Sequence, residues 1–357
     1  MSSETRDYPG LPPFPKDVPT APLLRISLKK LLSHESEEVK RLMDTCEDVG
    51  FFYLDLQDAG SCSSILDDAD RLFAISKEFY NLSLEEKKKY DFSAQNSYFG
   101  YKEQGAVVVD RQGTRDRNES YNVPKIDMLG IIAPLPRPGP FEKGRQAFVS
   151  FMKTSHSIVT LLLNLFNESL GLPEGTLASL HQIEAMSGDA VRLIKAPPQH
   201  PDDRDGIVLP EHTDYGSITF VFNQLGGLQV LPPGKDAKYV NVEPLPGHMI
   251  VNIGDALVKF TNGLFRSNIH HIVAPPGAQG DFTRYSLIYF SRPNDDVNLK
   301  RLEGSKRIPP LAEGVVEEII NSRDWVLRRG LGRRATQAHV DLEKCAGTET
   351  LSRRVQV

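Results

Sequence analysis

Three residues of this 357-residue chain have the types and the spacing of a metal site: His212, Asp214 and His270. Side chains two positions apart on a β-strand point to the same face, so the His212 imidazole and the Asp214 carboxylate can share one ion. A second imidazole from a distant strand, that of His270, completes a set of two histidines and one carboxylate. Such a facial set is typical of non-haem Fe(II), and it leaves positions open for dioxygen and an organic ligand.

Arg284 and Ser286 have the same two-residue spacing further along the chain. A guanidinium and a hydroxyl on one face of a strand can hold a carboxylate through charge-assisted hydrogen bonds, partly in bidentate fashion. The sequence therefore predicts a seat for an organic acid beside the metal.

The surrounding sequence resembles the Fe(II)/2-oxoglutarate-dependent oxygenase superfamily, in its isopenicillin N synthase-like branch. The resemblance spans roughly residues 20 to 330 and rests on an ordered series of motifs. These are Cys46–Tyr53, Glu211–Thr219, Gly227–Val230, Pro246–Asp255, Thr261–Gly263, Ser267–His270 and Arg284–Ser286. The resemblance implies Fe(II) bound by the triad, 2-oxoglutarate as cosubstrate, O2 as oxidant and ascorbate as a candidate reductant. It also implies that Arg284 and Ser286 anchor the far carboxylate of 2-oxoglutarate.

His271 adjoins His270 and must face the other way on a strand, so only one of the two can reach the metal. The family pattern Ser-x-x-His, here beginning at Ser267, selects His270. Asp255 is expected to hydrogen-bond within a turn rather than to bind metal.

Seven further residues are candidate substrate contacts: Tyr98, Phe99, Tyr101, Arg192, Ile194, Asn252 and Phe290. The three aromatic residues fall in a segment that approaches the mouth of the active site in the resembled family, although a surface connection is an equal alternative. By alternation from Arg284, Phe290 faces the barrel interior, where core packing alone would also explain it. For Arg192, Ile194 and Asn252, a structural role and a pocket role stay open.

One departure from the family pattern concerns the cosubstrate. Many members carry a tyrosine immediately before the proline of the first barrel strand, and its hydroxyl helps bind the distal carboxylate; here Ala196 precedes Pro197. A lost hydrogen bond to a charged group costs about 1.5 to 3 kcal/mol. Relatives that use no 2-oxoglutarate also keep Arg-x-Ser, so an iron oxidase independent of 2-oxoglutarate remains an alternative. A catalytically silent barrel that only binds is the other one.

The elements that must position these residues follow from hydrophobic periodicity. Helices are expected over Ser36–Val49 with Ser36 as N-cap, over Ser63–Tyr80, from Ser83, over Phe141–Leu170 without interruption, and over Val315–Leu327. Strands are expected over Phe51–Leu56, Val191–Lys195, Ser217–Asn223, Leu228–Leu231, Met249–Ile253, His271–Ala274 and Tyr285–Phe290. Short, regularly spaced strands predict a sandwich or jelly roll. With the resemblance, the expected fold class is α+β, a double-stranded β-helix core of cupin-like type flanked by helices.

Four segments are expected along the chain. Residues 1–20 form a proline-rich leader, and residues 21–185 form a mostly helical region with a few strands. Residues 186–295 form the double-stranded β-helix domain, and residues 296–357 form a C-terminal helical region with a polar tail.

Composition narrows the class of partner. A net charge of −5 gives no basic field for nucleic acid or an anionic membrane, so a small molecule is the expected partner. Three cysteines are too few for a disulfide framework. The sequence also lacks the pattern of a secretory signal and the run of about 18 apolar residues that a membrane-spanning helix needs. We therefore expect a cytoplasmic enzyme, and the resembled branch implies a monomer.

The expected activity is oxidation of a C–H bond of a small organic molecule, giving hydroxylation, desaturation or radical rearrangement. The Leu231–Gly234 segment and the long Ala274–Phe282 turn look more like fungal biosynthetic members than plant ones. This resemblance points to a natural-product intermediate as substrate.

Overall fold

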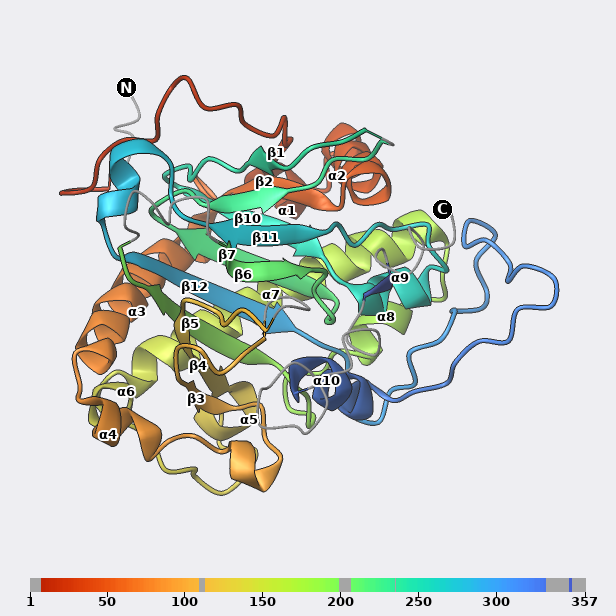
Figure 1. Ribbon diagram of the computed structural model, residues 1–357. Helices are drawn as coiled ribbons and strands as arrows, with labels where there is room; N and C mark the ends of the chain where they lie inside the picture. The colour runs from red at the N-terminus through yellow and green to blue at the C-terminus, as the bar shows by residue number, and fades with distance from the viewer. Residues whose placement is uncertain (1–7, 109–112, 199–206, 235, 332–346, 349–357) are drawn as a thin grey trace.

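Two β-sheets form the centre of the computed structural model, which describes residues 8–108, 113–198, 207–234, 236–331 and 347–348 (Figure 1). The larger sheet has the strand order β1-β2-β10-β7-β12-β5-β4-β3, and the smaller has the order β6-β11-β8-β9. The larger sheet consists of β1 (Arg25–Ser27), β2 (Phe51–Asp55), β10 (His248–Ile253), β7 (Ile218–Asn223), β12 (Arg284–Ser291), β5 (Ala190–Ala196), β4 (Glu119–Pro124) and β3 (Gly100–Lys102). The smaller consists of β6 (Ile207–His212), β11 (His270–Val273), β8 (Leu228–Val230) and β9 (Val240–Asn241). The expected α+β double-stranded β-helix is confirmed.

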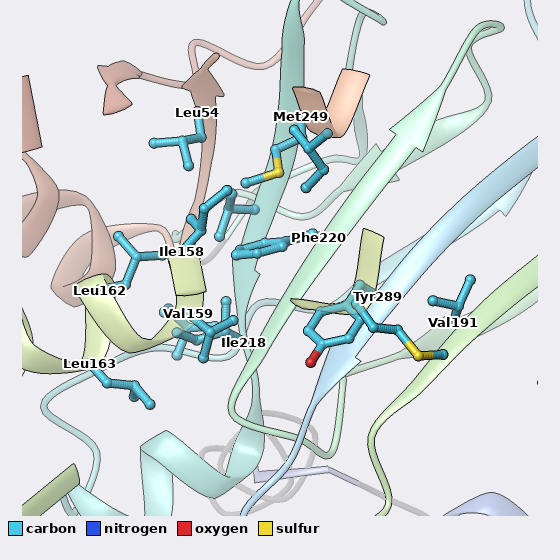
Figure 2. Packing of buried hydrophobic residues seen from close by; sticks show 14 of the residues in the cluster. Leu54, Ile158, Val159, Leu162, Leu163, Val191, Ile218, Phe220, Met249 and Tyr289 are labelled. Carbon is cyan, nitrogen blue, oxygen red and sulfur yellow. The ribbon is translucent and has the colours of Figure 1, made fainter. Parts of the chain in front are cut away.

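Helices flank the two sheets. They are α1 (Leu28–Leu32), α2 (Ser36–Asp48), α3 (Ser64–Tyr80), α4 (Leu84–Lys88), α5 (Lys125–Met128), α6 (Gly139–Lys143), α7 (Arg145–Leu170), α8 (Thr176–Ser179), α9 (Asp255–Phe260) and α10 (Ser322–Leu331). Figure 2 shows Ile158, Val159 and Leu162 of α7 pointing toward Phe220 and Ile218 of β7. This apolar layer fixes the sheet whose opposite face holds the site.

Side-chain alternation along β12 separates core from site. Leu287 and Tyr289 are fully buried in the core beneath α7. Ser286, Ile288 and Phe290 point to the other face and line a cavity between the sheets. The prediction that Phe290 faces the barrel interior is therefore confirmed.

The prediction of a single helix over Phe141–Leu170 is wrong, because the helix is broken at Gly144. A Cβ at this glycine would lie 2.3 Å from Cδ1 of Ile75 in α3. α3 thus lies close to the point where α6 ends and α7 begins, and a larger residue there would displace the Ile75 side chain. The helix ends at Gly171, as expected, with the glycine in the left-handed conformation.

Two other helix starts differ from expectation. Ser36 is the first residue of α2, and Glu35 is the N-cap without a side-chain cap bond. The C-terminal helix starts at Ser322 rather than Val315, because the Asn321 side chain accepts a hydrogen bond from the Asp324 amide at 2.8 Å and caps it. Ser83 caps α4 as expected, accepting from the Glu86 amide at 3.2 Å.

The described part of the proline-rich leader, from residue 8 onward, lies against the turn η4 (Gly277–Asp281), as the red and cyan segments of Figure 1 show. The Gln279 side chain donates to Pro12 O at 2.9 Å and accepts from the Gly226 amide at 2.9 Å. Phe14 packs so closely on Gly226 that a Cβ there would lie 2.8 Å from its ring. The leader is thereby tied to the loop before β8.

Cys46 and Cys62 are free thiols, and Cys345 lies outside the described residues. In the described part of the chain, none of the helices combines the length and the apolar composition needed to cross a membrane.

Candidate active site

The two histidines and the carboxylate of the predicted triad meet at one end of the smaller sheet. His212 is the last residue of β6, Asp214 lies two residues beyond it, and His270 begins β11 directly opposite His212 in the ladder. One ligand atom from each residue lies within 4.8 Å of the others. Asp214 Oδ1 is 3.7 Å from His212 Nε2 and 4.0 Å from His270 Nε2. This is a facial arrangement of ligands with one side left open.

Both imidazoles are oriented by backbone carbonyls. His212 Nδ1 lies 2.8 Å from Pro210 O, and His270 Nδ1 lies 3.1 Å from Asn268 O. A carbonyl can only accept, so Nδ1 carries the proton in each ring and Nε2 keeps its lone pair for a metal. The donor set therefore fits Fe(II) both in its residue types and in the tautomers of its two histidines.

Asp214 is held as a carboxylate. Burial opposes its ionisation, but positive charge on His270 and His212 when they are protonated, together with hydrogen bonds from Thr219 and Asn252, lowers its pKa to about 2. Asn252 Nδ2 donates to Asp214 Oδ2 at 2.8 Å. The other polar atom of this amide, Oδ1, is buried and has no hydrogen-bond partner among the described residues. An acceptor without a partner beside the triad fits a site built to take a further ligand.

His271 points away from the triad. Its Nε2 lies 2.7 Å from Gln229 Oε1, and its ring stacks on Tyr239 with centroids 3.8 Å apart. The structure thus brings His270, and not its neighbour, to the metal position.

Arg284 lies in the same cavity as the triad and is 3% exposed. Its Nε donates to Gly226 O at 2.7 Å, and Nη1 donates to Ser286 Oγ. Among the described residues, no carboxylate lies within ion-pair distance of this guanidinium, and burial lowers its pKa to about 10. A buried charge is costly unless it is paired, so the arrangement fits an anionic ligand supplied from outside.

Ala196 pairs directly with Arg284 across the β5–β12 ladder. The methyl group forms part of the cavity wall, and no tyrosine is found among the described residues that line this cavity. Lys195 does not replace the missing hydroxyl, because its Nζ is 3.3 Å from Glu119 on the other side of the sheet.

A second cavity, of about 130 Å³, adjoins the first. The two share Asn118, Arg192, Ile194, Leu209 and His212 in their walls. Of the predicted substrate contacts, Tyr98, Arg192 and Ile194 line the second cavity, whereas Asn252 and Phe290 line the first. We call the second one the polar cavity.

Two predicted contacts lie outside both cavity walls. Phe99 packs on Tyr98 with ring centroids 4.3 Å apart. Tyr101 is 1% exposed, packs edge-on against Phe79, and donates from its hydroxyl to Glu119 Oε2 at 2.7 Å.

Residues not singled out from the sequence also line the polar cavity. Asn118, directly before β4, and Ser120 and Asn122 within it occupy alternate positions and line this cavity, while Tyr121 and Val123 face the core. A polar residue at every second position is the signal that could have identified this wall. Tyr215 and Arg329 complete the group, and they come from the metal-binding loop and from α10.

Arg329 fastens α10 to the metal-binding loop. Its Nη1 lies 2.5 Å from Asp255 Oδ2, and its Nη2 donates to Thr213 O at 3.0 Å. Asp255 also accepts from Thr213 Oγ1 at 3.0 Å. Asp255 is therefore a fully buried anchor for the loop between His212 and Asp214. It is contacted both by Thr213 of that loop and by Arg329 of α10.

Two guanidinium groups lie over the aromatic ring of Phe290. The Cζ atoms of Arg192 and Arg292 are each 4.8 Å from the centroid of its ring. Burial raises the pKa of Tyr215, but Arg292 and Arg192 outweigh it and the pKa lies below its ordinary value. The wall beside the triad thus has a positive potential.

Comparisons with known proteins agree with this geometry. Residues 187–293 match the 2OG-Fe(II) oxygenase superfamily, and residues 21–128 match the family described as non-haem dioxygenase in morphine synthesis N-terminal. A 2-oxoglutarate-dependent dioxygenase of Aspergillus fumigatus is 33% identical over 88% of this chain and 86% of its own. The dioxygenase gloE of Glarea lozoyensis is 31% identical over 81% of this chain and 85% of its own.

Among solved structures, that of a full-length Neurospora crassa protein in complex with alpha-KG superposes with a TM-score of 0.72. The match covers 86% of this chain and 95% of that one, at 24% identity, which supports the fold alone. The family match, the fungal relatives and the triad together show that the chain belongs to the 2OG-Fe(II) oxygenase superfamily. It is a 2-oxoglutarate-dependent dioxygenase that uses Fe(II) at His212, Asp214 and His270.

Proposed function

We propose that this dioxygenase oxidises a C–H bond of a small organic molecule bound in the polar cavity, while Arg284 and Ser286 hold the distal carboxylate of 2-oxoglutarate. The observation that carries the proposal is the buried Arg284 guanidinium. It donates hydrogen bonds only to neutral acceptors among the described residues, and it lines the same cavity as the triad. When bound, Fe(II) and 2-oxoglutarate supply the oxidising chemistry with O2.

The protein's own contribution is placement. Arg284 orients the cosubstrate from one end of the cavity, and Asn252 holds the Asp214 carboxylate in one rotamer by its 2.8 Å hydrogen bond. Ile194 and Arg192 form a wall common to both cavities, so a molecule in the polar cavity lies next to His212. The position of the substrate's C–H bond relative to the metal site at His212 decides between hydroxylation, desaturation and rearrangement.

The substrate contacts that we propose are Tyr98, Arg192, Ile194, Asn252 and Phe290, which line the two cavities. Similarity to fungal 2-oxoglutarate-dependent dioxygenases supports a natural-product intermediate as the substrate.

The experiment is an anaerobic titration of the Fe(II)-loaded protein with 2-oxoglutarate, followed by the visible charge-transfer band of the chelate. A saturable band is expected for the wild type. His270→Ala should lose both bound iron and the band, whereas His271→Ala, which changes the adjacent imidazole that faces Gln229 and Tyr239, should keep both.

Iron that binds normally without any band would favour an oxidase that does not use 2-oxoglutarate. Failure of the wild type to bind iron would contradict the metal site itself.

A further inference from the structure

Arg192 occupies the boundary between the two cavities. It lies in the middle of β5, paired with Asn122 of β4 on one side and Ile288 of β12 on the other. Its side chain lines both the triad cavity and the polar cavity. A ligand that spans both cavities would lie along the wall that they share, and Arg192 is the arginine in that wall.

The hydrogen-bond partners of Arg192 are neutral side chains. Nε donates to Asn122 Oδ1 at 2.6 Å, and the Tyr215 hydroxyl is a further partner. Its planar group lies over Phe290, with Cζ 4.8 Å from the ring centroid. In the described residues, no carboxylate lies within ion-pair distance of it. A guanidinium has five N–H donors in a fixed fork, so donors remain for a ligand.

The other cations of the polar cavity are compensated. Lys102 pairs with Asp116, and Arg329 pairs with Asp255 at 2.5 Å. Within the described lining, Arg192 is thus the cation that lacks an acid.

Arg292 adds a second positive charge near Phe290, with Cζ 4.8 Å from the ring centroid. It is 1% exposed, and Asp189 accepts from its backbone amide at 2.7 Å. Asp189 also lies 3.6 Å from Lys125, and among the described residues no carboxylate lies within ion-pair distance of the Arg292 guanidinium. The excess positive charge near Phe290 is therefore open to compensation by a ligand.

From this geometry we propose that Arg192 is the substrate-binding cation, and that the substrate carries an oxyanion next to the C–H bond that is oxidised. A carboxylate matches the fork in two parallel hydrogen bonds, and the ionised oxygen of an acidic enol matches one donor. The inference rests on the proposed function, because it assumes that the polar cavity takes the substrate while 2-oxoglutarate occupies the seat at Arg284.

The test compares acids with their neutral amides. The probes are 4-fluorobenzoate and 4-fluorophenylacetate with 4-fluorobenzamide and 4-fluorophenylacetamide. They are titrated anaerobically into the full-length Fe(II) protein at saturating 2-oxoglutarate and observed by 19F NMR. Line broadening beyond that in the Zn(II)-loaded protein reports proximity to iron, and the charge-transfer band confirms that the acid has not displaced 2-oxoglutarate.

We expect at least one acid to bind about tenfold or more tightly than its amide, as a charge-assisted hydrogen bond implies. Arg192→Gln should abolish this preference, and Arg192→Lys should keep part of it, because the charge remains but the fork is lost. Lys153→Gln, which removes one positive charge from the exposed face of α7, is the matched control and should keep the whole preference.

Acids that bind no better than their amides in the wild type, undetectable binding of both included, would overturn the proposal. This comparison needs no variant, so it stands even if Arg192→Gln fails to fold. A preference for the acid over its amide that survives in Arg192→Gln would overturn the proposal too. So would an Arg192→Gln variant that loses affinity for 2-oxoglutarate alone. Failure of the proposed function is recognised separately, because the wild type would then show no charge-transfer band before any probe is added.

Discussion

Arg284 and Asp214 show how single charges are prepared for ligands that the chain does not contain. Asp214 is surrounded by groups that favour its ionised form, and its pKa of about 2 keeps it ready for a metal. Arg284 is surrounded by neutral groups, and burial lowers its pKa to about 10. The carboxylate is thus stabilised by the protein, whereas the guanidinium is tolerated at a cost until an acid arrives.

Replacement of Arg284 by methionine should separate stability from binding. Without its ligand, Arg284→Met is expected to be at least as stable as the wild type and up to about 3 kcal/mol more stable, because an apolar side chain of similar length removes an unpaired buried charge. Thermal melting with and without 2-oxoglutarate measures both effects. The wild type should be stabilised by 2-oxoglutarate and the variant should not. A variant that melts well below the wild type without ligand would contradict this account of Arg284.

Ser286 offers a milder test of the same seat. Ser286→Ala removes the hydroxyl that contacts Arg284 and should weaken 2-oxoglutarate binding by about tenfold, the effect of one lost hydrogen bond in a charged site. The charge-transfer titration measures it. An affinity equal to that of the wild type would remove Ser286 from the seat.

At this scale the metal site was predictable, because residue type and two-residue spacing carry the information. The triad and the Arg284–Ser286 pair could be named before any fold was known. Tyr101 shows the limit: its place in an aromatic segment made it a candidate contact, but its hydroxyl bonds Glu119 and its ring packs on Phe79. Which face of a short strand meets the cavity depends on pairing partners that the local sequence does not contain.

Among the elements, α10 is the one whose role depends most on distant residues. It begins at Asn321's cap and brings Arg329 to Asp255 and Thr213, while Trp325 Nε1 donates to Tyr215 O at 2.9 Å. Both contacts reach the loop that carries His212 and Asp214. The helix thereby holds the metal-binding loop from the C-terminal side of the chain.

Two adjacent arginines of α10 allow a matched comparison. Arg329→Met leaves Asp255 buried without its cation and should destabilise the protein by about 3 to 5 kcal/mol. Arg328→Met breaks a pair with Glu318 that is partly exposed on both sides and should cost about 1 kcal/mol or less. Chemical denaturation of the iron-free proteins measures the difference. Similar losses in the two variants would exclude a special role for the Arg329 contact.

The boundaries of the helices were harder to predict than their existence. Hydrophobic spacing extended the C-terminal helix back to Val315, yet Val316 is 93% exposed and lies outside any helix. The break at Gly144, where α6 ends and α7 begins, interrupts an apolar pattern that is continuous in the sequence. Periodicity indicates that an apolar face exists, while caps and neighbouring helices decide where it ends.

On the scale of the whole molecule, both ends of the described chain support the site. The leader reaches Gly226 through Gln279, and Gly226 O accepts from Arg284. α10 reaches Thr213 from the other terminus. The larger sheet likewise combines β1 to β4 with barrel strands, so the leading region and the barrel share one sheet. The overall fold class was predictable from motif order, but these contacts between distant segments were not.

The leader contact predicts an effect on the cosubstrate without any contact to it. Gln279→Ala removes the link between Pro12 and Gly226 and should weaken 2-oxoglutarate binding by about threefold, through a less fixed Gly226 carbonyl. Gln146→Ala, on the exposed face of α7, is the control and should leave the titration unchanged. Equal affinities in the two variants would show that the leader does not help to position Arg284.

The unpaired charge of Arg284 also links the lifetime of the protein to its metabolic surroundings. A ligand that binds the folded state alone stabilises it by mass action, by about 2.7 kcal/mol at a concentration one hundred times its dissociation constant. If Arg284 holds 2-oxoglutarate as we propose, the charge stays uncompensated when the cosubstrate is scarce, and a larger fraction of molecules is then expected to unfold. Resistance to proteolysis would then rise and fall with the supply of 2-oxoglutarate, so the amount of enzyme would follow its cosubstrate before any substrate is turned over.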